Sequence, residues 1–115
     1  MIVDDHAGMR STIREICHCP GDSVIELCDG LEALAAYREH SPDWIVMDIE
    51  MPGGDGISTT MSILAEDPAA RIIIVTQYDD DEIIEAARAT GAVACVLKED
   101  LSQLPEIMAG TGAVI

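Results

Sequence analysis

Short apolar runs alternate along this chain with longer segments whose apolar residues recur at helical spacing. Short β-branched runs separated by helix-length segments are typical of buried parallel strands. Clusters of Gly, Pro, Ser and Asp separate the two kinds of segment. We therefore predict an α/β fold in which a strand is followed by a helix five times, giving a parallel sheet with helices on both faces. The expected strands are 1–3, 23–28, 44–47, 71–75 and 93–97, and the expected helices are 8–17, 31–40, 57–66, 79–89 and 101–108.

Polar residues follow four of the expected strands at the point where each strand ends. They are Asp4 and Asp5 after the first strand, Asp48 after the third, Thr76 after the fourth and Lys98 after the fifth. Ligand sites in an open parallel sheet form at the carboxyl ends of the strands. We therefore expect three carboxylates, a hydroxyl and an ammonium along one edge of the sheet, where they could carry out phosphoryl chemistry.

Crowded carboxylates repel one another unless some are protonated or bind a cation. Oxygen ligands without clustered His or Cys favour Mg²⁺, and a carboxylate such as that of Asp48 can also attack phosphorus. Lys98 is the only lysine of the chain, and its ammonium could pair with a phosphoryl oxygen or a carboxylate.

Each of these residues also has a purely structural interpretation. Asp4 and Asp5 could form a solvated turn, Asp48 could cap a turn, Lys98 could reach water, and Thr76 could be an ordinary strand residue.

Composition and charge narrow the function classes. A chain of 115 residues fits one domain, and its formal net charge of −16 disfavours nucleic acids and anionic membranes as direct partners. No apolar run approaches the length of a membrane span and we expect no leader peptide, so we predict a cytoplasmic protein. Its four cysteines are then expected to be reduced thiols. We do not expect a zinc site at Cys17-His18-Cys19, because no second ligand pair follows.

Several motifs, in order along nearly the whole chain, resemble one known family. They are Val3-Asp4-Asp5-His6, Ile45-Val46-Met47-Asp48-Ile49-Glu50-Met51-Pro52, Asp55-Gly56, Ile74-Val75-Thr76, and Val96-Leu97-Lys98 after Gly91-Ala92. The pattern resembles the CheY-like receiver domain of two-component response regulators. Val-Asp-Asp-His and Leu-Lys-Glu-Asp-Leu especially resemble receivers that precede LuxR/NarL-type DNA-binding domains.

The resemblance implies a flavodoxin-like (βα)5 fold and a role for each residue at the sheet edge. Asp48 is the implied phosphoacceptor for a phosphoryl group from a sensor histidine kinase. Asp4, Asp5, Asp48 and the main-chain carbonyl of Glu50 are the implied Mg²⁺ ligands. Thr76 and Lys98 are the implied contacts of the phosphoryl group. The implied protein is a signalling domain rather than an enzyme, with an effector domain or output protein as a further partner and a homodimer as an open alternative.

The chain departs from the family pattern at several positions. Receivers often carry an aromatic residue three positions before the lysine, where this chain has Cys95. They usually have a small residue after the switch threonine and often a proline after the lysine, where this chain has Gln77 and Glu99. Tyr78 is then the best candidate to replace the missing aromatic, so we expect Tyr78 and Cys95 to form the switch surface. The first strand is short and no effector domain follows, so we expect either a stand-alone receiver or one domain of a longer regulator.

Three alternatives to a phosphorylated receiver remain open on the sequence. The first is a degenerate receiver that binds partners without being phosphorylated. The second is an aspartate-nucleophile phosphohydrolase resembling haloacid dehalogenases, suggested by Asp48-Ile49-Glu50 but disfavoured because its nucleophile belongs on the first strand. The third is a flavin- or nucleotide-binding module, which would need a phosphate-binding loop where this chain has Asp4-Asp5-His6.

Overall fold

The structure is a computed structural model that describes residues 1–17, 23–51 and 56–109. Five parallel strands form one sheet in the order β2-β1-β3-β4-β5, so the predicted α/β fold with five strands is confirmed. The strands are β1 (Ile2–Val3), β2 (Glu26–Leu27), β3 (Ile45–Asp48), β4 (Ile72–Thr76) and β5 (Ala94–Leu97). The helices are α1 (Ala7–Cys17), α2 (Ala33–His40), α3 (Gly56–Glu66), α4 (Asp81–Ala89) and α5 (Leu104–Met108), with 3₁₀ helices η1 (Gly30–Glu32) and η2 (Lys98–Gln103).

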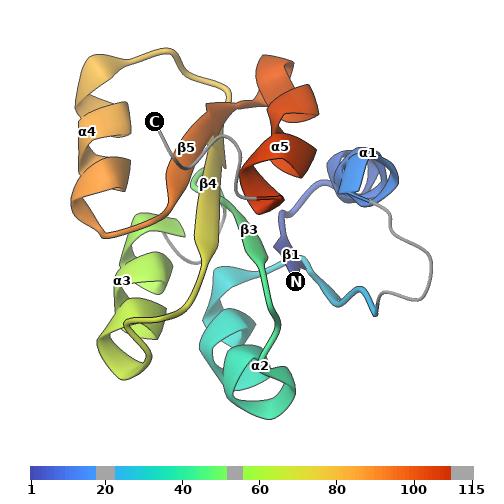
Figure 1. Ribbon diagram of the computed structural model, residues 1–115, viewed down its shortest axis with the longest axis vertical. Helices are drawn as coiled ribbons and strands as arrows, with labels where there is room; N and C mark the ends of the chain where they lie inside the picture. The colour runs from blue at the N-terminus through green and yellow to red at the C-terminus, as the bar shows by residue number, and fades with distance from the viewer. Residues whose placement is uncertain (18–22, 52–55, 110–115) are drawn as a thin grey trace.

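The two central strands, β3 and β4, are buried along their whole length, which explains why they read as continuous apolar runs. Their successive side chains point to opposite faces of the sheet. Ile45 and Met47 belong to a core shared with α2, α3 and α4, whereas Val46 belongs to a second core shared with α1, η2 and α5. Figure 1 shows α3 and α4 on one side of the strands and α1 and α5 on the other. Helices therefore cover both faces, as the sequence predicts.

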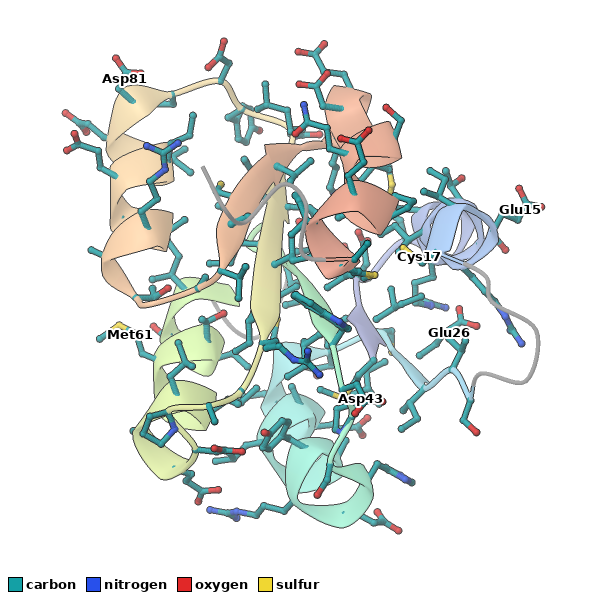
Figure 2. All side chains as sticks on the ribbon, in the orientation of Figure 1. Glu15, Cys17, Glu26, Asp43, Met61 and Asp81 are labelled. Atoms are coloured by element: carbon teal, nitrogen blue, oxygen red, sulfur yellow. The ribbon has the colours of Figure 1, made fainter. Side chains whose placement is uncertain are left out.

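Local capping residues explain where several of these helices begin and end. The Asp80 carboxylate accepts hydrogen bonds from the amides of Glu82 and Ile83 at the start of α4. Figure 2 labels Asp81, the first residue of this helix. Gly91 follows α4 with φ of 96°, a left-handed conformation that favours glycine, as expected for the residue after a helix. None of the helices in the described ranges is long and apolar enough to cross a membrane.

Several boundaries differ from the sequence prediction. The expected helix 101–108 is two segments, the 3₁₀ helix η2, which already begins at Lys98, and the α-helix α5, which has Pro105 in its first turn. The second strand is limited to Glu26–Leu27, while β4 extends by one residue to Thr76. Short edge strands have few ladder hydrogen bonds, so sequence patterns bound them poorly. The predicted loop residues 52–55, including Asp55, and His18 and Cys19 lie outside the described residues.

Gly56 lets the start of α3 approach the end of β3 closely. A Cβ atom at this position would lie 2.7 Å from Cα of Ile49 and 2.9 Å from the carbonyl carbon of Asp48, both of which are backbone atoms. The Gly56 amide also donates to the Ile49 carbonyl at 3.5 Å. Backbone cannot move aside as a flexible side chain would, so this position requires glycine and fixes the distance between α3 and Asp48.

We predict that Gly56→Ala lowers the free energy of unfolding by about 1–3 kcal/mol, the usual range for overpacking. Gly8→Ala in α1 is the matched control, because nothing lies within 4 Å of a Cβ added there. The control should be neutral or raise the free energy of unfolding by up to about 1 kcal/mol, since alanine favours helices over glycine. Urea denaturation measures both values, and an equal loss in the two variants would contradict the close approach.

Candidate functional site

The register of the sheet brings the expected residues to one edge. Val3 pairs with Met47, Asp48 pairs with Val75 and Thr76 pairs with Leu97. Each strand end is therefore level with, or one residue beyond, the end of its neighbour. Strand order reverses between β1 and β3, the position where a crevice forms in open α/β sheets. Asp4, Asp48, Thr76 and Lys98 therefore meet at this carboxyl edge, close to the reversal.

Lys98 joins the carboxylates of two strands. It follows β5 directly, and its Nζ lies 3.3 Å from Oδ1 of Asp48 and 3.6 Å from Oδ2 of Asp4. Burial by itself would lower the pKa of Lys98, but the charges of Asp48 and Asp4 outweigh burial and raise that pKa. Lys98 therefore carries a positive charge between two fully buried carboxylates, and the alternative in which it reaches for water is wrong.

Asp4 and Asp5 lie side by side because the first strand has already ended at Val3. Within a strand, neighbouring side chains would point to opposite faces. Here ligand atoms of Asp4, Asp5 and His6 all lie within 4.8 Å of one another. Nδ1 of His6 is 3.0 Å from Oδ1 of Asp5, and the His6 amide donates to Oδ1 of Asp4 at 2.9 Å. The tight cluster contains His6 as its third member, and Asp48 is connected to it through Lys98.

Asp48 is fully buried at the end of β3. Its Oδ1 accepts a hydrogen bond from the Glu50 amide at 3.1 Å. Burial is the largest factor that raises the pKa of Asp48 to about 7, followed by the nearby Glu50 carboxyl group and the charge of Asp4. The Asp48 carboxyl therefore changes charge near neutral pH, a property that concentrates at functional sites.

The Thr76 hydroxyl is fully buried between two partners. Its Oγ1 donates to Oε1 of Glu50 at 2.7 Å and accepts from the Tyr78 amide at 3.1 Å. The sequence analysis considered Glu50 for its main-chain carbonyl and as part of the Asp48-Ile49-Glu50 pattern, and it missed the contact of this side chain with Thr76. No local signal marks it, since an acid two residues after a strand usually points to water.

Tyr78 and Cys95 occupy different environments. The Tyr78 side chain is largely exposed, with 49% of the residue accessible, whereas Cys95 is half-buried against the core shared with α2, α3 and α4. Burial raises the pKa of the Cys95 thiol, so the thiol stays protonated and behaves as a small apolar group. The alternation expected along β5 is present, because Ala94 and Val96 pack in the opposite core.

The residues at this edge fit a hard divalent cation. Oδ2 of Asp4, Oδ1 of Asp5 and Oδ2 of Asp48 are buried. In the described part of the chain the first two have only their ion-pair contacts with Lys98 and His6, and Oδ2 of Asp48 has no hydrogen-bond partner. Buried carboxylate oxygens without donors are costly, and a cation that prefers oxygen ligands would satisfy them. The nitrogen of His6 is the one non-oxygen donor of the cluster.

Comparison with known proteins places this geometry in a family. Residues 1–109 match the family model of the response regulator receiver domain. The chain is 36% identical to the chemotaxis protein CheY of Halobacterium salinarum over 94% of this chain and 88% of that protein. It is 35% identical to the oxygen regulatory protein NreC of Staphylococcus carnosus over 85% of this chain, but it spans only 46% of that relative.

Solved structures give the same result. A LuxR-family two-component response regulator from an Aurantimonas species superposes with a TM-score of 0.85 and 39% identity, covering 96% of this chain and 84% of the other. The CheX–CheY complex with BeF3 and Mg²⁺ from Borrelia burgdorferi gives a TM-score of 0.83 and 29% identity, covering 95% of this chain and 85% of the other. The family match covers nearly the whole chain, and the strand order and the acidic edge agree with it. The chain therefore belongs to the response regulator receiver domains of two-component systems, which are signalling domains that work with histidine kinases and effector domains.

Proposed function

We propose that this chain is one receiver domain, residues 1–115, that accepts a phosphoryl group on Asp48 from a phosphohistidine of a sensor kinase. The single observation that best supports the proposal is the buried Asp48 carboxylate held beside the Lys98 ammonium at 3.3 Å. A carboxylate in this position can act as a nucleophile while the ammonium offsets charge that develops on a phosphoryl oxygen. The rival phosphohydrolase is disfavoured because Asp48 ends the third strand of the chain.

The chain's own groups suggest how Asp48 would react. The Glu50 amide holds Oδ1, which leaves Oδ2 as the oxygen without a hydrogen-bond partner in the described residues. Oδ2 would form the new P–O bond as the P–N bond of the phosphohistidine breaks. The electron pair of that bond would return to the imidazole nitrogen, which then takes a proton. Positioning and charge stabilisation dominate phosphoryl transfer, so fixed neighbours such as Lys98 matter more than acid–base chemistry.

We propose Asp4, Asp5, Asp48 and the main-chain carbonyl of Glu50 as the residues that would hold Mg²⁺. The unpartnered carboxylate oxygens support this assignment. When bound, the ion would neutralise part of the charge on the phosphoryl oxygens and on the carboxylates. Asp4 and Lys98 are already paired at 3.6 Å, so the chain would hold one side of the site in place before any ion arrives.

The partners follow from the family and remain proposals for this chain. A sensor histidine kinase would supply the phosphoryl group, and an effector domain or a separate output protein would respond to it. NreC, a relative of about twice this length, is named as an oxygen regulatory protein, which favours a regulatory output. We propose a cytoplasmic location. We also propose no direct contact of this domain with nucleic acid, because its net charge is −16. A homodimer stays an open proposal.

We predict that the protein gains one phosphate on Asp48 when incubated with a small phosphodonor and Mg²⁺. Asp48→Asn removes the nucleophile and should abolish the gain, and EDTA should do the same. Asp43→Asn is the matched control, because Asp43 is exposed and lies two residues before the start of β3, at the other end of that strand from Asp48. Intact-mass analysis measures the outcome. Phosphate uptake by the Asp48→Asn protein would refute the assignment, and no uptake by the wild-type protein would favour a degenerate receiver.

Mg²⁺ should raise the melting temperature by relieving repulsion among the carboxylates. Mg²⁺ at ten times its Kd would add about 1.4 kcal/mol of stability. Asp5→Asn should raise the melting temperature of the metal-free protein and weaken Mg²⁺ binding, because it removes one charge and one ligand. Thermal denaturation with and without Mg²⁺ measures both effects. A lower melting temperature of the metal-free Asp5→Asn protein would show that the carboxylates do not destabilise one another.

Tyr78 is the proposed route by which the phosphorylated state reaches the surface of α4 and β5, since Cys95 is too small to act as a movable aromatic. A hydrogen bond of 3.1 Å from the Tyr78 amide to the Thr76 hydroxyl supports this role. We predict that beryllofluoride shifts the NMR signals of Tyr78 and of neighbouring α4 and β5 residues. Tyr78→Ala should reduce the distal shifts and leave those beside Asp48 intact. An unchanged distal response in that variant would exclude Tyr78 as the route.

A further inference from the structure

The Glu50 side chain contacts Thr76, which the family resemblance implies as a contact of the phosphoryl group, and Glu50 follows Asp48 by two residues. Its Oε1 is 2.7 Å from the Thr76 hydroxyl oxygen. Its main-chain amide donates to Oδ1 of Asp48 at 3.1 Å, so the residue is anchored beside that carboxylate. The other oxygen, Oε2, is buried and has no hydrogen-bond partner among the residues described. Glu50 is therefore turned into the site and away from water.

The hydrogen-bonding capacity of Thr76 makes this arrangement exclusive. A hydroxyl group has one proton to donate, and the proton of Thr76 is used on Glu50. The Thr76 oxygen accepts from the Tyr78 amide, so it is also occupied as an acceptor. The hydroxyl cannot donate to Glu50 and to a phosphoryl oxygen at the same time. One acceptor has to leave before the other can bind.

The charges at the edge add to this competition. Glu50 brings a further carboxylate to a site that already contains Asp4, Asp5 and Asp48. Lys98 is the single ammonium paired with this group, and it is shared between Asp48 and Asp4. A carboxylate and a phosphoryl group present similar negatively charged oxygens, so Glu50 can occupy the position of a phosphoryl oxygen and would also repel one.

We infer that Glu50 is an internal stand-in for the phosphoryl group. In the unphosphorylated protein its carboxylate holds the Thr76 hydroxyl, and it must swing away before that hydroxyl can reach a phosphoryl group on Asp48. This inference rests on the proposed function and extends it, because it makes Glu50 a positioning residue that restrains both phosphorylation and the movement of Thr76. Removing the side chain should therefore make the site easier to fill.

The test compares Glu50→Ala and Glu50→Gln with Glu99→Gln at saturating Mg²⁺. Glu99 is the matched control, because it is an exposed acid near the same edge, directly after Lys98. Beryllofluoride affinity and the rate of Asp48 phosphorylation by a small phosphodonor are measured for each protein. Glu50→Ala should increase both by about tenfold, a factor equivalent to about 1.4 kcal/mol. Glu50→Gln keeps an acceptor for Thr76 without the charge and should give a smaller increase, and Glu99→Gln should stay within about twofold of the wild type.

A second measurement needs no phosphoryl group. The Tyr78 amide reports on the Thr76 hydroxyl, so its NMR shift in the ligand-free protein should change in Glu50→Ala and not in Glu99→Gln. If the wild-type protein is phosphorylated on Asp48 but Glu50→Ala increases neither the rate nor the beryllofluoride affinity, this inference is overturned and the proposed function stays intact. An equal increase of affinity and rate in Glu99→Gln would also overturn the inference, because the loss of one negative charge anywhere near the site would then explain the effect. No labelling of Asp48 in any of the proteins would overturn the proposed function and this inference together.

Discussion

One buried ammonium organises the carboxyl edge of this sheet. Asp4 and Asp48 are both fully buried, and Lys98 lies 3.6 Å from one and 3.3 Å from the other. Two buried carboxylates without a counter-charge would be strongly unfavourable, so the position of Lys98 makes their burial possible. The three residues come from the ends of three different strands, and their contact therefore depends on the register of the whole sheet.

The apolar body of the protein keeps that edge in place. Side chains of β3 and β4 alternate between two cores, one shared with α2, α3 and α4 and the other with α1, η2 and α5. Each face is therefore fixed by packing, and a shift of one residue would move every buried side chain to the wrong face. Gly56 adds a second restraint, because it sets how near α3 comes to the backbone of Asp48. The site is rigid because both faces of the sheet are filled.

Against this rigid frame, Glu50 and Thr76 are the parts of the edge that can change partners. Their hydrogen bond of 2.7 Å connects the loop after β3 to the end of β4, and Thr76 is connected in turn to the amide of Tyr78. A new acceptor at Asp48 would compete for the same hydroxyl proton. The path from Asp48 to the surface residue Tyr78 would then be a short chain of hydrogen bonds, in which the Thr76 hydroxyl has two alternative acceptors.

The sequence by itself determined the fold class and the residues of the edge. Four buried apolar runs, each followed by Asp4-Asp5, Asp48, Thr76 or Lys98, are local patterns, and parallel strands necessarily bring their ends to one side. Boundaries of short elements such as β2 and the change from 3₁₀ to α geometry between η2 and α5 were less accessible, because pairing with neighbouring strands and small differences in backbone angles decide them. The four-residue segment 52–55 lies outside the described chain, so the expectation for Asp55 stays a prediction.

Only the tertiary structure decided which of these polar groups pair. Glu50 and Thr76 are 26 residues apart in sequence, and no pattern around either one specifies that their side chains meet. Likewise, the apolar run predicted that the first strand ends before the acids, but it did not specify that the His6 ring lies against Asp4 and Asp5. Hydrophobic periodicity specifies which face of the sheet a side chain occupies. The partner of a polar side chain depends on distances of a few ångströms between separate strands, and the packing of the entire sheet sets those distances.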